Sequence, residues 1–277
     1  MYEYSGVNMY KLIALDLDGT LLNSDKQISS ENKAAIDAAR AEGVRVVLVS
    51  GRPTSGMRES LEALNMLSDD DYVLSYNASV VQKVKSETII RSQILTGHNA
   101  KQLANLAKQL DINIHAFSPQ KGLITPAHND YTTHESVING DTITLIDFEE
   151  LADDEAILKV MLVDHADKLS AAIAQLPAAL YEQFTIVQSA PFFLEFLNKD
   201  SNKGIGVKAL ADHLSIPAEQ VICMGDAGND FHMIQYAGLG VAMGNATDDI
   251  KAVADHITVT NDLHGVAKVI NDFVLKV

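Results

Sequence analysis

The feature that most constrains the fold is a repeated alternation of short apolar runs with alanine-rich or amphipathic segments. In the first part of the chain the apolar runs cover residues 11–17, 44–49 and 72–75, and helices are expected at about 29–43 and 55–67. Runs that are apolar throughout are typical of strands buried on both faces. Strands that alternate with helices form parallel sheets covered by helices on both sides. We therefore expect an α/β fold with a Rossmann-like, doubly wound parallel sheet.

The same alternation returns after about residue 200. The predicted elements there are helices at 201–214, 229–236, 247–254 and 266–274 and strands at 221–224, 239–243 and 256–260. The intervening stretch mixes strands and helices in a different order, which is typical of an α+β domain inserted into the α/β domain. We predict a discontinuous core (9–82 and 190–277), a cap domain (83–189) and a leader (1–8) outside the fold. Met9 is then a candidate for the natural start.

The charge balance excludes some classes of partner. The chain of 277 residues has 21 Lys and Arg against 37 Asp and Glu, a formal net charge of −16. Nucleic acids and anionic membrane surfaces are bound by clustered basic residues, so neither is expected as a partner. The single cysteine excludes an intramolecular disulfide and is typical of a reducing compartment. With no secretory signal and no apolar stretch of about 20 residues, we expect a soluble cytoplasmic protein.

Two carboxylates follow the first predicted strand, in the sequence Asp16-Leu17-Asp18-Gly19-Thr20. Residues two apart in an extended chain point the same way, so Asp16 and Asp18 project together. Open α/β sheets bind ligands at this carboxyl end of their strands. An Asp-Gly turn that merely closes the strand is the alternative, and this motif alone does not decide between them.

A second acidic motif, Gly225 to Asp230, follows another apolar strand and precedes a helix. Taken alone, Asp226 and Asp230 could simply cap that helix. If Asp16, Asp18, Asp226 and Asp230 converge on one crevice, each pair of charges repels by about 4 kcal/mol at ~4 Å and an effective dielectric near 20. Such a cluster requires a cation, and hard oxygen ligands select Mg²⁺. We therefore predict that these four aspartates form a magnesium site.

Two further residues supply what a phosphate group needs. Ser50 ends the second predicted strand, where its hydroxyl and nearby backbone N–H groups can donate to a phosphate oxygen. Lys203 begins a predicted helix, where a positive charge lies close to the positive helix end. Either residue alone is more often a surface group or a cap, and Lys199 and Lys208 are rivals for the role of Lys203.

These pieces, in this order, are similar to the motifs of one family. The marks are LDLDGTLL (15–22), VSGRP (49–53), Leu194-Glu195 with Lys203-Gly204, GDAGND (225–230) and YAGLGVAMGNA (236–246). The chain resembles the haloacid dehalogenase superfamily of phosphohydrolases, in its Cof-type branch with a class IIB cap, over essentially all of residues 9–277. One departure is that this branch usually has Asn-Gly-Ala where this chain has Asn77-Ala78-Ser79. Ala78 tolerates a positive φ poorly, so the local geometry near the hinge between core and cap is in question.

The resemblance implies a role for each motif. Asp16 would be the nucleophile that forms an aspartyl-phosphate. Asp18 would be the general acid and base, and its backbone carbonyl would bind Mg²⁺. Ser50 and Lys203 would hold the transferring phosphoryl group and neutralise its charge.

The resemblance also implies the remaining contacts of the site. Asp226 would bind Mg²⁺ directly, and Asp230 would support the metal site. Asn229 would lie near the phosphate. Gly51 and Arg52 would lie at the mouth of the crevice, where Arg52 faces either the cap or the substrate.

Several other residues are expected to have structural roles. Cys223 lies in an apolar strand and is expected to be a buried small hydrophobe. The acidic run 69–71 is expected to be a solvated loop, and His232 to be a surface or supporting residue. His115, His128 and His134 fall in the cap, where one of them is a candidate for contact with substrate.

The predicted function is therefore a Mg²⁺-dependent phosphatase acting on a small phosphorylated metabolite such as a sugar phosphate. Two alternatives remain open at this point: a sugar phosphomutase, and a non-catalytic phosphometabolite sensor or phosphorylation switch. Specificity is expected to lie in the cap, in about residues 127–141. The sequence does not distinguish a monomer from a homodimer.

Overall fold

The computed structural model describes residues 9–276, which fall into two compact units. The first unit contains the described residues up to Ser50, then Arg58–Arg91, and the chain from Asn202 onward; the second contains Gly51–Met57 and Ser92–Ser201. The inserted unit thus begins and ends later than the predicted boundaries at 83 and 189, and it includes a short segment from the first part of the chain. The predicted leader, residues 1–8, lies outside the described residues.

The first unit is built on an eight-stranded, mainly parallel sheet with the order β16-β15-β14-β1-β2-β3-β4-β5. Its strands are β1 (Leu12–Asp16), β2 (Arg45–Val49), β3 (Tyr72–Ser75), β4 (Val80–Lys83), β5 (Ile89–Ser92), β14 (Val221–Gly225), β15 (Leu239–Ala242) and β16 (His256–Ile257). The strands from β16 to β3 pair in parallel, and β4 runs antiparallel to β3. Strand β1 is buried at every position, as its apolar sequence predicts.

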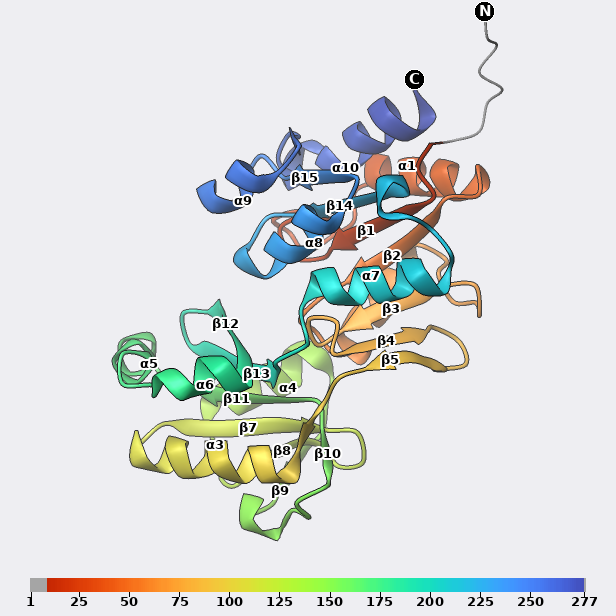
Figure 1. The fold of residues 1–277 in the computed structure, drawn as a ribbon. Coiled ribbons are helices and arrows are strands. Elements are labelled where there is room, and N and C mark those ends of the chain that lie inside the picture. The colour runs from red at the N-terminus through yellow and green to blue at the C-terminus, as the bar shows by residue number, and fades with distance from the viewer. Residues whose placement is uncertain (1–8, 277) are drawn as a thin grey trace, which may run out of the picture. The chain divides into compact units, whose positions relative to one another are not determined.

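Helices cover both faces of this sheet, so the expected doubly wound fold is confirmed. They are α1 (Ser30–Ala41), α2 (Arg58–Ala63), α7 (Lys203–His213), α8 (Phe231–Tyr236), α9 (Asp248–Val253) and α10 (Gly265–Val269). Figure 1 shows α7 and α8 on one face and α1 on the other. Val207 and Leu210 of α7 belong to the same buried cluster as Leu12 and Ala14 of β1. Ser29 caps α1, because its side chain accepts a hydrogen bond from the Asn32 N–H.

The second unit has its own sheets and its own core. Its six-stranded sheet has the order β12-β13-β11-β7-β8-β9, and β6 and β10 form a separate pair. The strands are β6 (Leu95–Thr96), β7 (Asn113–Ser118), β8 (Gly122–Thr125), β9 (Ile143–Leu145), β10 (Ala156–Ile157), β11 (Lys159–Val163), β12 (Phe184–Ala190) and β13 (Phe193–Asn198); the helices are α3 (Gly97–Gln109), α4 (Asp130–Asn139), α5 (Ala166–Ile173) and α6 (Ala178–Gln183). Leu103, Phe148 and Phe196 lie in its buried apolar cluster. This is the α+β insert that the sequence predicts.

The differences from the predicted elements have physical causes. Strand β13 pairs with both β11 and β12, so it belongs to the second unit although it follows the predicted boundary. The stretch after β11 forms two helices and not one, because Pro177 precedes α6 and cannot continue a helix. Helix α4 lies in a polar stretch without a clear apolar period, and Asn129 caps it.

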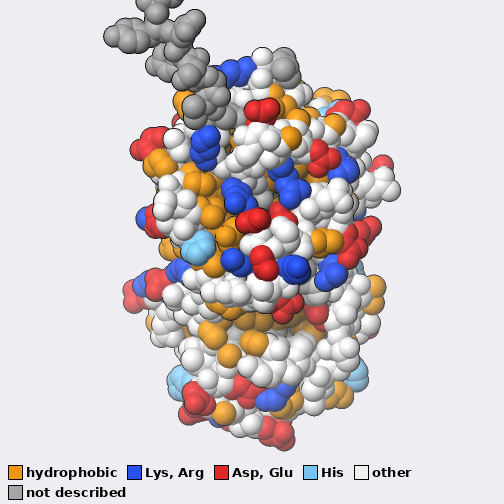
Figure 2. Space-filling view, turned by 90° about the vertical axis from the view of Figure 1, so that its right-hand side faces the viewer, with side chains coloured by type: hydrophobic (Ala, Val, Ile, Leu, Met, Phe, Trp, Pro, Cys, Tyr) orange, Lys and Arg blue, Asp and Glu red, His pale blue; other side chains and the backbone are white. Residues whose placement is uncertain are grey.

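One face of the surface carries charged side chains of both signs. Figure 2 shows acidic and basic side chains interspersed over the face that it presents. Among residues 9–276, no helix combines the length and the apolar character needed to span a bilayer.

Candidate active site

Three carboxylates meet at the carboxyl ends of β1 and β14. Asp16 is the last residue of β1, and Asp226 directly follows β14, which pairs with β1 in parallel. Asp16, Asp226 and Asp230 each offer a carboxylate oxygen, and these oxygens lie within 4.8 Å of one another. The structure therefore brings together three of the four aspartates predicted to bind metal.

A buried lysine neutralises part of this charge. The Lys203 Nζ lies 2.5 Å from Asp16 Oδ1 and 2.6 Å from Asp230 Oδ1, and its side chain has no exposed surface. Burial disfavours the ammonium, but the two carboxylates outweigh it and raise the pKa of Lys203 above its usual value. The other two lysines considered for this role lie outside the acidic cluster. Lys208 pairs with Asp212 on the surface of α7, and Lys199 belongs to the second unit.

Asp230 uses both carboxylate oxygens to organise the site. Its Oδ2 accepts hydrogen bonds from the backbone N–H groups of Asp226 at 2.9 Å and Ala227 at 3.0 Å, while its Oδ1 accepts from Lys203. The turn fits closely around this side chain, since a β-carbon on Gly225 would come within 2.4 Å of the Asp230 carboxyl carbon. Asp230 therefore orients the acidic loop and the lysine together.

The donor set fits a hard divalent cation. Burial and the negative charge of Asp230 raise the pKa of Asp226 to about 6, and they raise the pKa of Asp16 well above its usual value. Thr20 Oγ1 donates to Asp226 Oδ1 at 2.9 Å, which orients that carboxylate. Gly19 has a φ of +84°, and a β-carbon there would lie 2.4 Å from Asp226 Oδ2. A cation bound between Asp16 and Asp226 would relieve the repulsion that these pKa shifts reflect.

Asp18 lies beside this cluster and outside it. Its Oδ1 forms an ion pair with Lys26 Nζ at 2.8 Å, and both side chains are partly exposed. Its negative charge contributes to the raised pKa of Asp226, so the two carboxylates are neighbours. The predicted role of Asp18 as general acid and base stays a prediction.

Ser50 and Asn229 connect the site to the turn after β3. Ser50 is buried, its backbone N–H donates to Leu74 O, and its carbonyl accepts from the Asn77 N–H, both at 2.9 Å. The Ser50 N–H is thus bonded to the sheet, and the predicted binding of phosphate by the Ser50 hydroxyl stays a prediction. Asn229 Nδ2 donates to Asn77 Oδ1 at 3.0 Å. Its predicted contact with phosphate stays a prediction.

Gly51 and Arg52 belong to the second unit. There Arg52 Nη1 donates to the carbonyl oxygen of Gly56 at 3.1 Å. Their predicted place at the mouth of the crevice stays a prediction.

The turn after β3 has the positive φ that its sequence disfavours. Tyr76, Asn77 and Ala78 have φ values of 53°, 53° and 66°, and Ala78 is fully buried. A glycine would adopt this backbone without strain. Ala78, which stands where the family usually has glycine, therefore occupies a position whose positive φ disfavours a β-carbon. The β-carbon of Ala78 faces Gly206 of α7, where a second β-carbon would come within 2.2 Å.

Three supporting residues were not predicted. Thr20 holds Asp226, Asn245 Nδ2 donates to the Gly19 carbonyl at 2.8 Å, and Asn245 Oδ1 accepts from the Asn261 N–H at 3.0 Å. Thr20 and Asn245 both lie within the family-like motifs. Their types alone do not indicate these contacts, because the partner residues are distant in the sequence.

The other histidines considered from the sequence, and the cysteine, lie in different environments. His115 is fully buried between Thr132 and Met161, and burial followed by the charge of Lys159 lowers its pKa to about 3, so it is a core residue. His134 packs against the ring of Phe192, and His128 is exposed. Contact of either residue with substrate stays a prediction. Cys223 is fully buried, as predicted.

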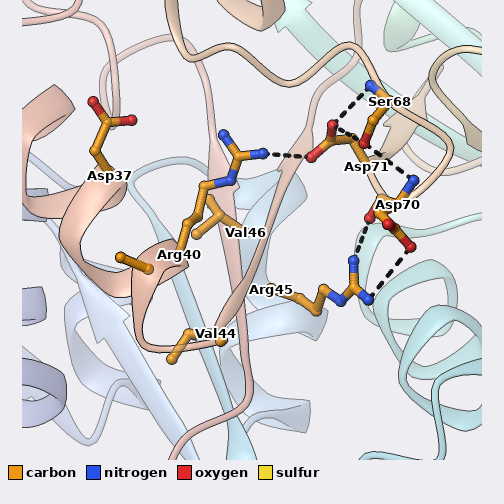
Figure 3. A pocket seen from close by; sticks show the side chains of 10 residues that line it. Asp37, Arg40, Val44, Arg45, Val46, Ser68, Asp70 and Asp71 are labelled. Atoms are coloured by element: carbon orange, nitrogen blue, oxygen red, sulfur yellow. Dashed lines mark hydrogen bonds and ion pairs between the residues drawn. The ribbon is translucent and has the colours of Figure 1, made fainter.

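The acidic run 69–71 is not wholly a solvated loop. Asp71 is buried and accepts from Arg40 Nη2 at 2.8 Å, and Arg45 Nη1 donates to the carbonyl of Asp70 at 2.7 Å. These residues line a cavity of about 560 Å³ at the amino end of β2 (Figure 3). Because its two arginines are paired with aspartates, we assign no ligand to this cavity.

Comparison with known proteins identifies relatives that match almost the whole chain. Residues 13–270 match the haloacid dehalogenase-like hydrolase family. YxeH of Bacillus subtilis is 39% identical over 96% of this chain and 99% of its own. The B. subtilis 5-amino-6-(5-phospho-D-ribitylamino)uracil phosphatase YcsE is 34% identical over 96% of each chain.

Solved structures of haloacid dehalogenase-like hydrolases are also similar to this chain. A haloacid dehalogenase-like hydrolase from Bacteroides thetaiotaomicron has a TM-score of 0.84 at 34% identity and covers 95% of this chain and 99% of its own. The subclass IIB sugar phosphatase BT4131 shares the fold, with a TM-score of 0.80 at 23% identity, over 95% of this chain and 98% of its own. The fold and the acidic site define a phosphohydrolase of two units. The chain belongs to the haloacid dehalogenase-like hydrolase family, in its Cof-type subclass IIB, and is a phosphoric monoester hydrolase.

Proposed function

We propose that this enzyme is a magnesium-dependent phosphatase that hydrolyses a small phosphorylated sugar or sugar alcohol through an aspartyl-phosphate. The observation that carries the proposal is the buried arrangement of Asp16, Lys203 and Asp230 beside Asp226. It combines a carboxylate nucleophile, a fixed positive charge and a set of hard oxygen ligands at one sheet edge.

In the first step the Asp16 carboxylate attacks phosphorus. A bond forms between an Asp16 oxygen and phosphorus as the bond from phosphorus to the alkoxide breaks, and Asp18 gives its proton to that alkoxide. Ser50 and Lys203 bind the oxygens of the transferring group. In the second step Asp18 takes a proton from water, the water oxygen attacks phosphorus, and the Asp16 carboxylate is released with inorganic phosphate.

Asp16, Asp226 and the backbone of Asp18 would hold the magnesium ion. When bound, it would supply positive charge that offsets the charge of the phosphate. Asp230 would act by orienting Lys203 and the backbone after Asp226.

The substrate class is supported by the relatives. YcsE acts on a phosphorylated ribityl compound, as its name states, and this chain matches it over 96% of its length. The net charge of −16 and the single buried cysteine support a small metabolite as substrate and the cytoplasm as location.

The decisive experiment is phosphate release from p-nitrophenyl phosphate by purified wild-type enzyme and Asp16→Asn with Mg²⁺. We expect the variant to lose activity by a factor on the order of 10³ or more, since the nucleophile is absent. Asp212→Asn, a surface aspartate of α7, is the matched control and should retain activity. Turnover by Asp16→Asn at the wild-type rate would refute the proposed nucleophile.

The same preparation separates hydrolysis from other outcomes. A panel of phosphorylated sugars and sugar alcohols should release inorganic phosphate in multiple turnovers. Conversion to an isomeric phosphate with little phosphate release would indicate a mutase, and a single burst with a stable phosphoenzyme would indicate a switch.

A further inference from the structure

Lys159 of β11 is an unusually buried lysine in the second unit, with 1% of its surface exposed. Its Nζ lies 3.3 Å from Glu195 Oε1 and 3.9 Å from Glu135 Oε1, and 5.0 Å from the centre of the Phe117 ring. A buried ion pair seldom stabilises a fold more than well-packed apolar residues would, because each charge must lose its hydration. Stability alone is therefore a poor explanation for a lysine here.

The same ammonium holds the backbone next to a site residue. Lys159 Nζ donates to the Gly51 carbonyl oxygen at 3.4 Å. Gly51 is bonded to Ser50 and begins the short segment Gly51–Met57 that belongs to the second unit. Ser55 Oγ of this segment donates to Asp141 Oδ1 at 3.3 Å, and Gly56 lies against Asn139, where a β-carbon would come within 2.4 Å of Oδ1.

Ser50 is held from its other side within the first unit. Its N–H donates to Leu74 O, and its carbonyl oxygen accepts from the Asn77 N–H. The peptide bond between Ser50 and Gly51 thus joins an anchor in the first unit to an anchor in the second. The Gly51 anchor follows the two Ser50 hydrogen bonds by one residue, so it restrains the backbone on the carboxyl side of Ser50.

We propose that Lys159 is a positioning residue for phosphate binding: by holding the Gly51 carbonyl, it fixes the backbone that aims the Ser50 hydroxyl at the phosphoryl group. This inference rests on the proposed function, in which Ser50 binds that group.

Inorganic phosphate is the suitable probe, because its inhibition constant reports the binding of the phosphate group alone. We would measure its inhibition constant against p-nitrophenyl phosphate hydrolysis in wild type, Lys159→Met and Ser50→Ala. Lys159→Met should raise the inhibition constant by about 10- to 100-fold, as misplacement of a binding group does. Partial unfolding would lower the amount of active enzyme and leave the inhibition constant of the folded molecules unchanged.

Glu135→Gln is the matched control, because it removes a carboxylate from the same cluster and keeps the ammonium beside Gly51. Its inhibition constant should stay within about two-fold of wild type. If Lys159→Met is too unstable to purify, the double variant Lys159→Met/Glu195→Gln removes the nearer of the two carboxylates that the first substitution leaves without the ammonium. It should show the same rise in the inhibition constant.

The outcomes separate the two proposals. A rise in Ser50→Ala without a rise in either Lys159 variant overturns the role of Lys159 and leaves the proposed function intact. An equal rise in Glu135→Gln overturns it as well, since disruption of the cluster would then be the cause. An unchanged constant in Ser50→Ala refutes the phosphate-binding role of Ser50 and, with it, this inference.

Discussion

At the scale of single residues, the site carries an excess of buried negative charge. Asp16, Asp226 and Asp230 contribute three carboxylates when ionised, and Lys203 contributes one ammonium. The difference is two negative charges, which a divalent cation would balance. Burial, followed by the negative charge of Asp230, raises the pKa values of both Asp16 and Asp226. Metal binding and the protonation of these carboxylates are therefore expected to compete.

Asp230 provides a test of orientation within the site. Asp230→Asn keeps the shape of the side chain but replaces one carboxylate oxygen with an NH₂ group, which cannot accept from both the acidic loop and Lys203. We expect kcat/KM to fall by about 10- to 100-fold, as for other residues that orient metal ligands. Titration of activity with Mg²⁺ should show a higher half-saturating concentration. Asp212→Asn is again the surface control, and a wild-type Mg²⁺ dependence in Asp230→Asn would contradict the assigned role.

The pKa of Asp226 predicts how stability depends on pH. Its folded value of about 6 lies above the ordinary 3.8, so between these values the folded protein binds more protons than the unfolded chain. Asp226 should therefore lower the free energy of unfolding of the metal-free protein as the pH rises from about 4 to about 6. Mg²⁺ requires the ionised carboxylate, so its effect on Tm should be small near pH 5 and larger near pH 7.

Thermal unfolding with and without Mg²⁺ at the two pH values measures this dependence. Asp226→Asn should remove the Mg²⁺ effect at both. An equal Mg²⁺-induced shift in Tm for the wild type at both pH values would show that protons and metal do not compete at Asp226.

At the scale of elements, the site depends on close packing between the turn after β3 and α7. A β-carbon on Gly206 would lie 2.2 Å from the Ala78 β-carbon and 3.0 Å from Leu74 Cδ2. Gly→Ala within a helix normally stabilises by about 1 kcal/mol. Here the steric cost should dominate, and we expect Gly206→Ala to lower the free energy of unfolding by about 1–3 kcal/mol.

A double-mutant cycle measured by urea unfolding tests that contact. Ala78→Gly alone should change stability by less than about 1 kcal/mol, because relief of the left-handed backbone offsets the lost buried methyl. In the Gly206→Ala background the same substitution should restore part of the lost stability. Strictly additive effects would show that the two β-carbons do not clash.

The elements also show which parts of the fold and site could be predicted. Continuous apolar sequence indicated β1, β2 and β14, and the polar residues at their carboxyl ends indicated the acidic cluster. Helix α4 was missed because its buried residues include Thr132, Glu135 and Asn139, which leave no apolar period. The partners of Thr20 and Asn245 were missed for a related reason, since hydrogen bonds between distant segments leave no local pattern.

At the scale of the whole molecule, the chain builds two units with separate apolar cores. The acidic cluster lies entirely in the first unit, whereas Phe148 lies in the core of the second, with 1% of its surface exposed. A unit with its own core can unfold in its own transition. The two units should then respond to different perturbations.

Calorimetry of the full-length protein tests this independence. Mg²⁺ at 100 times its Kd should stabilise the first unit by about 2.7 kcal/mol and raise the Tm of one transition. Phe148→Ala should destabilise the second unit by about 3–5 kcal/mol and lower the Tm of the other transition. A single transition that moves with both perturbations would contradict the prediction. It would show instead that the two units unfold as one cooperative structure, which would extend the coupling proposed for Lys159 from one peptide bond to the whole molecule.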